Sequence, residues 1–207
     1  MKNKRIFVGL DYRSPHYYLT GLSSSFEWLF HRYYHMDDSL AMYAFLNSFN
    51  KKYRDLIYRL PVFNCQFKTY GFEQFLSIQD VYQRTQVYQL KHAVDYLGLH
   101  AKRHQYQVAY VSARYYDEQL SFLGPVRTML TRVDIDVFAL WFYRSQQHPK
   151  PGLIRCLEYQ HHRLYGRDEC LWLEGLRGLD VDVFDVLDDS AWHIAESLAF
   201  GAYYHGL

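Results

Sequence analysis

The residues best suited to chemistry in this sequence gather at positions 161–169. His161 and His162 are followed by Arg163, and Glu169 ends the segment. A histidine, a cation and a carboxylate together could cleave a phosphodiester, so His161, Arg163 and Glu169 form a candidate catalytic cluster and a nuclease is one hypothesis. Neighbouring histidines point in different directions on a helix or a strand, which makes them a poor pair of metal ligands. An exposed polar segment is therefore the favoured interpretation.

The rest of the sequence contains none of the common catalytic motifs. It has no glycine-rich phosphate loop, no HExxH and no GxSxG. The three cysteines, Cys65, Cys156 and Cys170, are an odd number at wide spacing, which does not fit a zinc site and favours a reducing compartment. The sequence thus predicts no metal and no cofactor, and it favours a protein that is not an enzyme.

The charges are divided along the chain. Residues 169–207 contain eight of the 22 Asp and Glu residues but only one of the 23 Lys and Arg residues. The preceding residues are therefore basic, although the formal net charge of the whole chain is +1. A basic body favours a polyanion as partner, and an acidic segment favours a protein partner or a contact that masks the basic part.

Aromatic residues make up 19% of the chain, an unusually high share. Most of them are expected in the core or half-buried, because their rings supply large apolar area. Stacking platforms for nucleobases are the alternative interpretation. No stretch of sequence approaches the length of apolar residues that a membrane span requires, so we expect a cytoplasmic protein without a membrane partner.

Hydrophobic periodicity predicts a mainly α fold with a few short strands. The clearest helix runs from Asp38 to Leu60, with Phe49 at the centre of its apolar stripe and Pro61 at its end. Further helices are predicted at residues 26–33 and at about 81–97. Three segments alternate in the manner of strands, of which the last two remain open between strand and helix: residues 5–10, 61–71 and 105–113.

Residues 125–147 have the pattern of two short helices joined by a tight turn. Pro125 can begin the first helix, Asp134 to Asp136 supply the turn, and Val137 to Gln147 form the second helix. This is the pattern of a helix-turn-helix unit, although a plain helical hairpin of the core explains it as well. A DNA-binding unit here would draw its phosphate contacts from the basic residues in and after it, namely Arg127, Arg132, Arg144, Lys150, Arg155, Arg163 and Arg167.

A set of short motifs follows the same part of the chain: Leu123-Gly124, Met129-Leu130, Leu140, Tyr143-Arg144 and Pro149-Lys150-Pro151-Gly152-Leu153. In this order they resemble the FlhC-type subunit of the flagellar transcription activator, over about residues 120–155. The resemblance implies a DNA-binding regulator that acts with a protein partner. The zinc-binding cysteine cluster of that family is missing, because only Cys156 and Cys170 follow.

The acidic segment at residues 179–189 alternates aspartates with apolar residues. It is too apolar for a solvated tail, which predicts that it docks on a partner protein or on the basic body. The residues expected to make this contact are Asp180, Asp182, Phe184 and Asp185. An edge strand or last helix with its acids in water is the alternative.

These patterns predict one compact unit with three successive regions. They are an aromatic-rich helical region at 1–115, a basic helix-turn-helix-like region at 116–168 and an acidic segment at 169–207. The favoured function is a nucleic-acid-binding regulator of transcription whose partners are DNA and another protein. The alternative is a non-enzymatic adaptor, assembly subunit or inhibitor that works through protein contacts alone. Self-association of the chain stays open.

Overall fold

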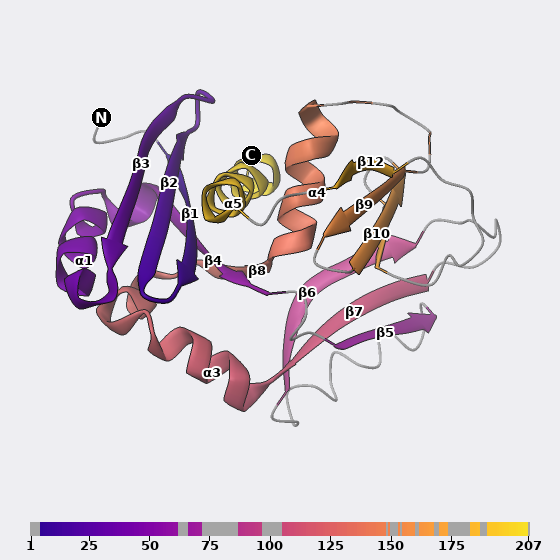
Figure 1. Ribbon diagram of the computed structural model, residues 1–207, viewed down its shortest axis with the longest axis horizontal. Helices are drawn as coiled ribbons and strands as arrows, with labels where there is room; N and C mark the ends of the chain where they lie inside the picture. The colour runs from indigo at the N-terminus through magenta and orange to yellow at the C-terminus, as the bar shows by residue number, and fades with distance from the viewer. Residues whose placement is uncertain are drawn as a thin grey trace. The chain divides into compact units, whose positions relative to one another are not determined.

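The computed structural model describes residues 5–61, 66–71, 87–96, 105–147, 149, 153, 155–159, 162–167, 170–173, 183–186 and 190–206. The chain divides into two units (Figure 1), each assembled from separate stretches of sequence. Unit 1 comprises Met1–Pro61, Glu118–Gln147 and Asp189–Leu207, and unit 2 comprises Val62–Asp117 and His148–Asp188. The three regions predicted above are defined by composition rather than by contacts, so that division stays a prediction.

Unit 1 is built on a five-stranded sheet with the strand order β3-β2-β1-β4-β8. Its strands are β1 (Ile6–Arg13), β2 (His16–Ser23), β3 (Trp28–His35), β4 (Arg54–Leu60) and β8 (Arg132–Ile135). The first three strands form an antiparallel meander, whereas β4 pairs parallel with β1 and β8 pairs parallel with β4. The strands β1 and β4 are almost fully buried, and β1 begins with the apolar run Ile6 to Leu10, whereas β4 carries Arg54, Asp55 and Arg59 among its apolar residues.

Helices cover both faces of this sheet. The helices of unit 1 are α1 (Ser39–Asn47), α4 (Asp136–Gln147) and α5 (Ala191–Gly206), together with the short 3-10 helices η1 (Met36–Asp38), η2 (Lys51–Tyr53) and η4 (Gly124–Met129). The residues of α3 (Ala113–Ser121) are divided between the units, up to Asp117 in unit 2 and from Glu118 in unit 1. Phe30 of β3 contacts Phe45 of α1, while the next residue, His31, contacts Trp192 of α5. Because successive residues of a strand point to opposite faces, α1 and α5 lie on opposite sides of the sheet. Figure 1 shows α5 between the sheet and α4.

Helix α5 approaches the sheet closely at Gly9 of β1. A Cβ atom at this position would lie 1.9 Å from the carbonyl oxygen of Ala195 and 2.8 Å from the amide nitrogen of Ala199. Both alanines are fully buried on α5. The small residues on the two elements therefore let the helix backbone rest directly on the strand.

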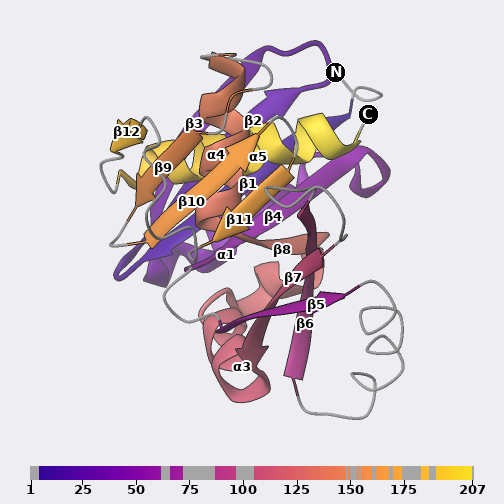
Figure 2. The same cartoon turned by 90° about the vertical axis from the view of Figure 1, so that its right-hand side faces the viewer.

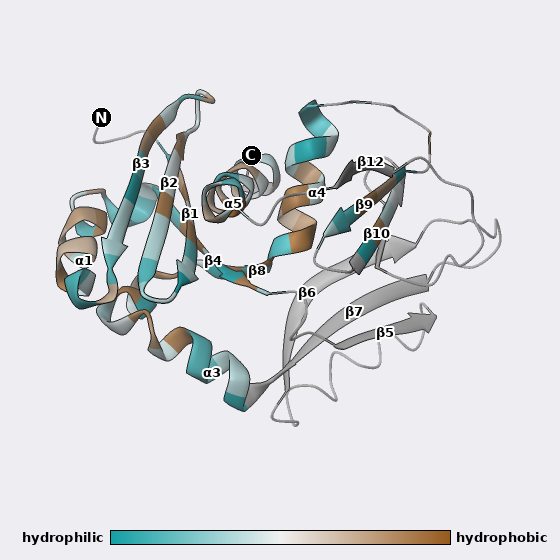
Figure 3. Ribbon diagram, viewed as in Figure 1, coloured by the Kyte–Doolittle hydropathy of each residue, from teal (hydrophilic) through white to brown (hydrophobic). Residues whose placement is uncertain are grey.

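The second helix of this layer, α4, is apolar at its start and polar at its end (Figure 3). Its residues from Asp136 to Trp141 are buried, and the exposed Gln146 and Gln147 end it. The apolar half packs in the core of unit 1, and α4 contacts α5. None of the helices in the described part of the chain combines the length and the apolar character that crossing a membrane requires.

Unit 2 contains two further sheets, which can be followed in Figure 2. One has the order β11-β10-β9-β12 and consists of β9 (Arg155–Tyr159), β10 (His162–Arg167), β11 (Cys170–Leu173) and β12 (Val183–Val186). The other has the order β5-β7-β6 and consists of β5 (Gln66–Gly71), β6 (Val87–Tyr96) and β7 (Gln105–Ser112). Cys156, Leu157, Tyr159 and Leu164 are buried in the first of these sheets.

The expectation of a mainly α fold is wrong, and the segment from Asp38 to Leu60 shows why. The helix in it, α1, ends at Asn47, and the side chain of Asn50 accepts a hydrogen bond from the Lys52 amide to begin η2. The residues after η2 form β4, which pairs with β1. A short helix is only marginally stable without tertiary packing, so the helical pattern of these residues does not prevent them from joining the sheet. Phe49 is half-buried beyond the helix, where its ring stacks on Phe30 with 5.6 Å between centroids.

The other helices predicted in the first half of the chain are also strands. Residues 26–33 lie mostly in β3, and the segment expected as a helix up to residue 97 contains β6. The strand expected at residues 5–10 is confirmed as the start of β1. The two ambiguous segments contain β5 and β7.

The predicted helix-turn-helix is not formed. The first predicted helix is the 3-10 helix η4, and the residues between it and α4 form β8, which is hydrogen-bonded to β4. Val137, Phe138 and Trp141 of α4 are buried, so the surface that would enter a DNA groove is packed in the core. The residues taken for a tight turn instead extend the sheet by one strand.

Gly9→Ala should destabilise unit 1 because its new methyl group meets helix backbone that has no flexible end to move away. We expect a loss of about 3 kcal/mol in the free energy of unfolding, measured by urea denaturation. Gly201→Ala is the matched control: a Cβ there has no neighbouring atom within 4 Å, and the change should stabilise α5 by up to about 1 kcal/mol. Equal unfolding midpoints for the two variants would contradict the close approach at Gly9.

Candidate functional site

Charged residues meet at one edge of the unit 1 sheet, where parallel strands end. Asp11 lies near the end of β1, Arg59 near the end of β4, and Asp136 directly after β8 at the start of α4. The carboxyl ends of parallel strands lie at the same edge of a sheet, and ligands commonly bind there in α/β proteins. This edge is therefore the first place to look for chemistry.

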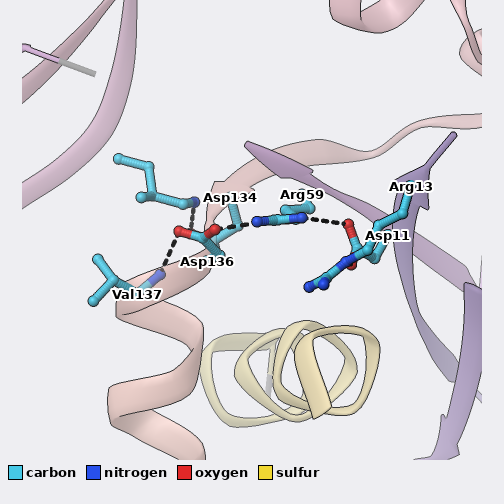
Figure 4. A network of polar contacts seen from close by, with 7 residues as sticks. Asp11, Arg13, Arg59, Asp134, Asp136 and Val137 are labelled. Carbon is cyan, nitrogen blue, oxygen red and sulfur yellow. Dashed lines mark hydrogen bonds and ion pairs between the residues drawn. The ribbon is translucent and has the colours of Figure 1, made fainter. Parts of the chain in front are cut away.

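Arg59 bridges two buried carboxylates (Figure 4). Its Nη1 lies 3.1 Å from Oδ1 of Asp11, and its Nε lies 2.9 Å from Oδ2 of Asp136. The second oxygen of Asp11 accepts from Nε of Arg13 at 2.9 Å. The second oxygen of Asp136 accepts from the amide of Val137 at 2.8 Å. All four oxygen atoms of the two carboxylates thus have a donor.

In this arrangement the carboxylates of Asp11 and Asp136 are neutralised by arginine and are not available to react. Both Asp11 and Asp136 are fully buried at 0% exposure, and Arg59 is 7% exposed. A buried carboxylate is tolerated when charged donors surround it, and an acceptor already occupied by arginine is poorly placed to bind a cation or to take up a proton. We therefore interpret this network as a structural link between β1, β4 and α4.

A third aspartate continues the link along β8. Asp134 is 3% exposed, and its Oδ1 accepts from the amide of Ile135 at 2.9 Å. Nη2 of Arg132 lies 4.0 Å from Oδ2 of Asp134. Two of the residues expected to form a tight turn, Asp134 and Asp136, thus bond the backbone amides that follow them.

The sequence analysis missed Asp11, Arg59 and Asp136. The pattern that could have revealed them is a charged residue at the end of a buried run: Asp11 follows Ile6 to Leu10, and Arg59 lies between Tyr58 and Leu60. Charged residues are rarely fully buried unless they are paired, so opposite charges in two apolar runs predict a pair. Only the strand register shows which charges meet.

Burial shifts the pKa of two further titratable groups, Cys156 and Tyr143. Burial raises the pKa of the Cys156 thiol, so the free cysteine stays protonated and is a poor nucleophile. Burial, with Glu196 nearby, raises the pKa of Tyr143, whose hydroxyl lies 3.4 Å from that carboxylate. Within the described residues no group of three or more His, Cys, Asp or Glu side chains is placed to hold a metal ion.

The basic residues predicted to bind phosphate lie in different settings in unit 1. Arg127 is exposed in η4. Arg132 is half-buried in β8. Arg144 lies in the last turn of α4, where its Nη1 donates to Gln147 at 2.8 Å.

In unit 2 the residues predicted to bind phosphate or a partner also lie in different settings. Arg155 is 5% exposed in β9, whereas Arg163 is exposed in β10 and forms an ion pair of 2.6 Å with Glu158. Arg167 ends β10, and Phe184 and Asp185 belong to β12, but their side chains lie outside the described residues. Five further predicted positions lie outside the described residues altogether: Lys150, His161, Glu169, Asp180 and Asp182.

A turn between β2 and β3 presents an exposed aromatic side chain. Phe26 has a φ of 61°, a left-handed conformation that glycine usually fills at this position of a hairpin loop. For another residue this conformation costs about 1–2 kcal/mol. The ring contacts Phe200 and Tyr203 of α5 at centroid distances of 5.8 and 5.4 Å, yet Phe26 remains 51% exposed. The Phe26 ring is thus held at the surface by a backbone conformation of higher energy.

Comparison with solved structures identifies the fold. The chain is similar to the cytoplasmic domain of EpsL, an inner membrane component of the type II secretion system of Vibrio cholerae, with a TM-score of 0.54, 12% identity and coverage of 95% of each chain. It is also similar to a structure of the PilM-PilN type IV pilus biogenesis complex, with a TM-score of 0.51 and 8% identity over 84% of this chain and 61% of that one. The two likenesses concern the fold alone. No sequence model of a protein family and no curated protein matches the chain.

These likenesses correct the favoured interpretation of the sequence. The resemblance to the FlhC-type activator subunit is wrong, because the segment that carried it contains β8 of the five-stranded sheet and the fold is similar to that of the EpsL cytoplasmic domain. DNA binding and regulation of transcription are likewise contradicted as the function, and DNA as the partner, since the structural neighbours are components of protein assemblies. The alternative, a protein that works through protein contacts, fits the neighbours better.

Replacing Arg59 should show how much the charge network contributes to the free energy of unfolding. Arg59→Met leaves Asp136 buried without its cation, and we expect a loss of about 3–5 kcal/mol in the free energy of unfolding, measured by urea denaturation. Asp136→Asn in the same chain should recover part of that loss, because the orphaned charge is gone. Strictly additive effects in this double-mutant cycle would mean that the two residues do not interact.

Proposed function

We propose that this protein is a non-enzymatic assembly subunit that acts in the cytoplasm, on a secretion or pilus machine of the cell envelope. The observation that carries the proposal is the similarity to the EpsL cytoplasmic domain, which extends over 95% of both chains. The likeness to the PilM-PilN complex supports the same class of protein. The subunit would bind a membrane-anchored component of the machine and hold it in place.

The buried charge network supports a role without catalysis. An enzyme built on this edge of the sheet would need a carboxylate with a free oxygen for a cation or a proton. Arg59 and Arg13 instead occupy both oxygens of Asp11, and Arg59 with the Val137 amide occupies both oxygens of Asp136. The same interactions stabilise the fold, so the site has a sufficient explanation in structure alone.

The aromatic surface around Phe26 supports binding of a protein partner. The ring network continues from Phe26 through Phe200 to Tyr204, which is itself exposed, and Phe142 stacks on Tyr204 with 6.0 Å between centroids. Exposed aromatic side chains that are already ordered lose little entropy on binding and commonly anchor protein interfaces. The strained backbone of Phe26 is consistent with selection for binding rather than for stability.

Phe26→Gly tests this surface without harming the fold. Glycine relieves the left-handed conformation while the ring contacts are lost, so the free energy of unfolding should change by no more than about 1 kcal/mol. In a deletion strain of the source organism, the wild-type gene should restore secretion or pilus formation and Phe26→Gly should restore it at least tenfold less well.

A photo-crosslinking side chain at position 26 should also join the protein to a membrane-anchored component of that machine. The same side chain at Leu40, which is exposed on α1 at the opposite face of the sheet, is the control and should not. Full restoration by Phe26→Gly, or crosslinks at both positions alike, would contradict this binding surface. Unimpaired secretion and piliation in the deletion strain would contradict the proposed function.

A further inference from the structure

Strand β3 forms an open edge of the unit 1 sheet. Among the described residues its only paired strand is β2. Natural proteins protect such edges with proline, lysine, inward charges or bulges, because an unpaired strand invites pairing with another chain. The eight residues of β3 contain no proline, glycine, lysine or acid, and the one bulge lies at the start, so that Phe30 to His35 form a regular ladder.

The backbone groups that face away from β2 can be assigned. The amide of Met36 donates to the carbonyl of Pro15 at 2.8 Å, so Met36 faces β2. In an antiparallel ladder the inward positions alternate with outward ones, which directs the backbone of Tyr34 and Arg32 toward β2. The amides and carbonyls of His31, Tyr33 and His35 consequently point to the open edge.

Contacts on both faces fix this edge in position. The Arg32 guanidinium lies over the Phe45 ring at 4.1 Å, and Phe30 packs edge-on against the same ring at 5.0 Å. On the other face His31 meets Trp192 at 5.8 Å. Tyr33, which is on the same face as His31, is 67% exposed. The strand is therefore ordered before any partner arrives, which lowers the entropy cost of pairing.

We propose that β3 pairs with β3 of a second copy of this chain, antiparallel about a two-fold axis at Tyr33. In this register Tyr33 pairs with its own copy, His31 pairs with His35, and Arg32 lies opposite Tyr34. The backbone groups of all the outward residues then find partners, and the two five-stranded sheets join into one continuous sheet. This interface goes beyond the proposed function and concerns self-association alone.

Charge and register select Tyr33 as the axis. An axis at Arg32 would place two arginines directly opposite each other, which is destabilising. An axis at His31 would carry the ladder into the bulge at the start of β3. With the axis at Tyr33, Arg32 faces the ring of Tyr34, a pairing that already occurs within the strand, where its Nη1 lies 3.5 Å from the Tyr34 hydroxyl. An axis at Tyr33 therefore avoids both the opposed arginines and the bulge.

The test is the oligomeric state of the purified full chain, measured by sedimentation equilibrium over a range of concentrations. We expect a monomer-dimer equilibrium. Tyr33→Pro removes an outward amide and leaves the bonds to β2 intact, so it should weaken the dimer at least tenfold. Tyr33→Thr, which keeps the amide and favours a strand, is the matched control and should still form the dimer.

Disulfide cross-linking tests the register and remains informative if Tyr33→Pro does not fold. With Cys65 and Cys170 changed to serine, Tyr33→Cys should form a covalent dimer on mild oxidation, because its partner is its own copy. Arg32→Cys, whose partner is Tyr34, and Ser25→Cys at the turn should cross-link far less.

Three results would overturn the pairing: a monomer at every concentration, a dimer that Tyr33→Pro leaves unchanged in affinity, or equal cross-linking at the three positions. A monomer whose Tyr33→Pro variant fails to bind a different protein would show that the edge receives a strand from another chain. None of these results bears on complementation by the Phe26 variant, so the two proposals fail separately.

Discussion

The Arg59 guanidinium is the interaction on which the arrangement of unit 1 depends. It belongs to β4, and its two bonds reach Asp11 on β1 and Asp136 at the first turn of α4. Three segments that are far apart in sequence are thereby held in one register at the edge of the sheet. Because a buried charge is costly when unpaired, competing registers that separate these residues are disfavoured more strongly than apolar packing alone could achieve. The network therefore contributes to the uniqueness of the fold.

The sequence predicted part of this fold, and the limits were physical. The strand at Ile6 to Leu10 was evident because its apolar residues are β-branched or aromatic and a turn follows. The apolar residues from Met42 to Leu60 have helical spacing, but this spacing does not show where a helix ends and a strand begins. Only the pairing of β4 with β1, a contact between distant residues, decides that its second half is a strand. Local patterns carry no information about such partners.

The candidate site was harder to predict for a related reason. Asp134 and Asp136 were taken for turn residues because aspartate often begins a helix, and Asp136 does lie at the start of α4. Their burial, and the arginine that neutralises one of them, depend on β8 lying beside β4. In the same way β3 was taken for a helix, so its open edge could not be foreseen. Exposed edges and buried pairs are properties of topology, and sequence periodicity reports on neither.

The contact between Gly9 and α5 can form only after both β1 and α5 have been synthesised. Strand β1 and helix α5 belong to one core, but the helix is translated about 180 residues after the strand. At about 5–20 residues per second this delay is on the order of 10 s. Throughout that time the face of β1 that α5 will cover has no partner, while the segments of unit 2 emerge and can fold. During this interval the nascent chain carries an uncovered apolar sheet face, the kind of surface that makes incompletely folded chains prone to aggregate.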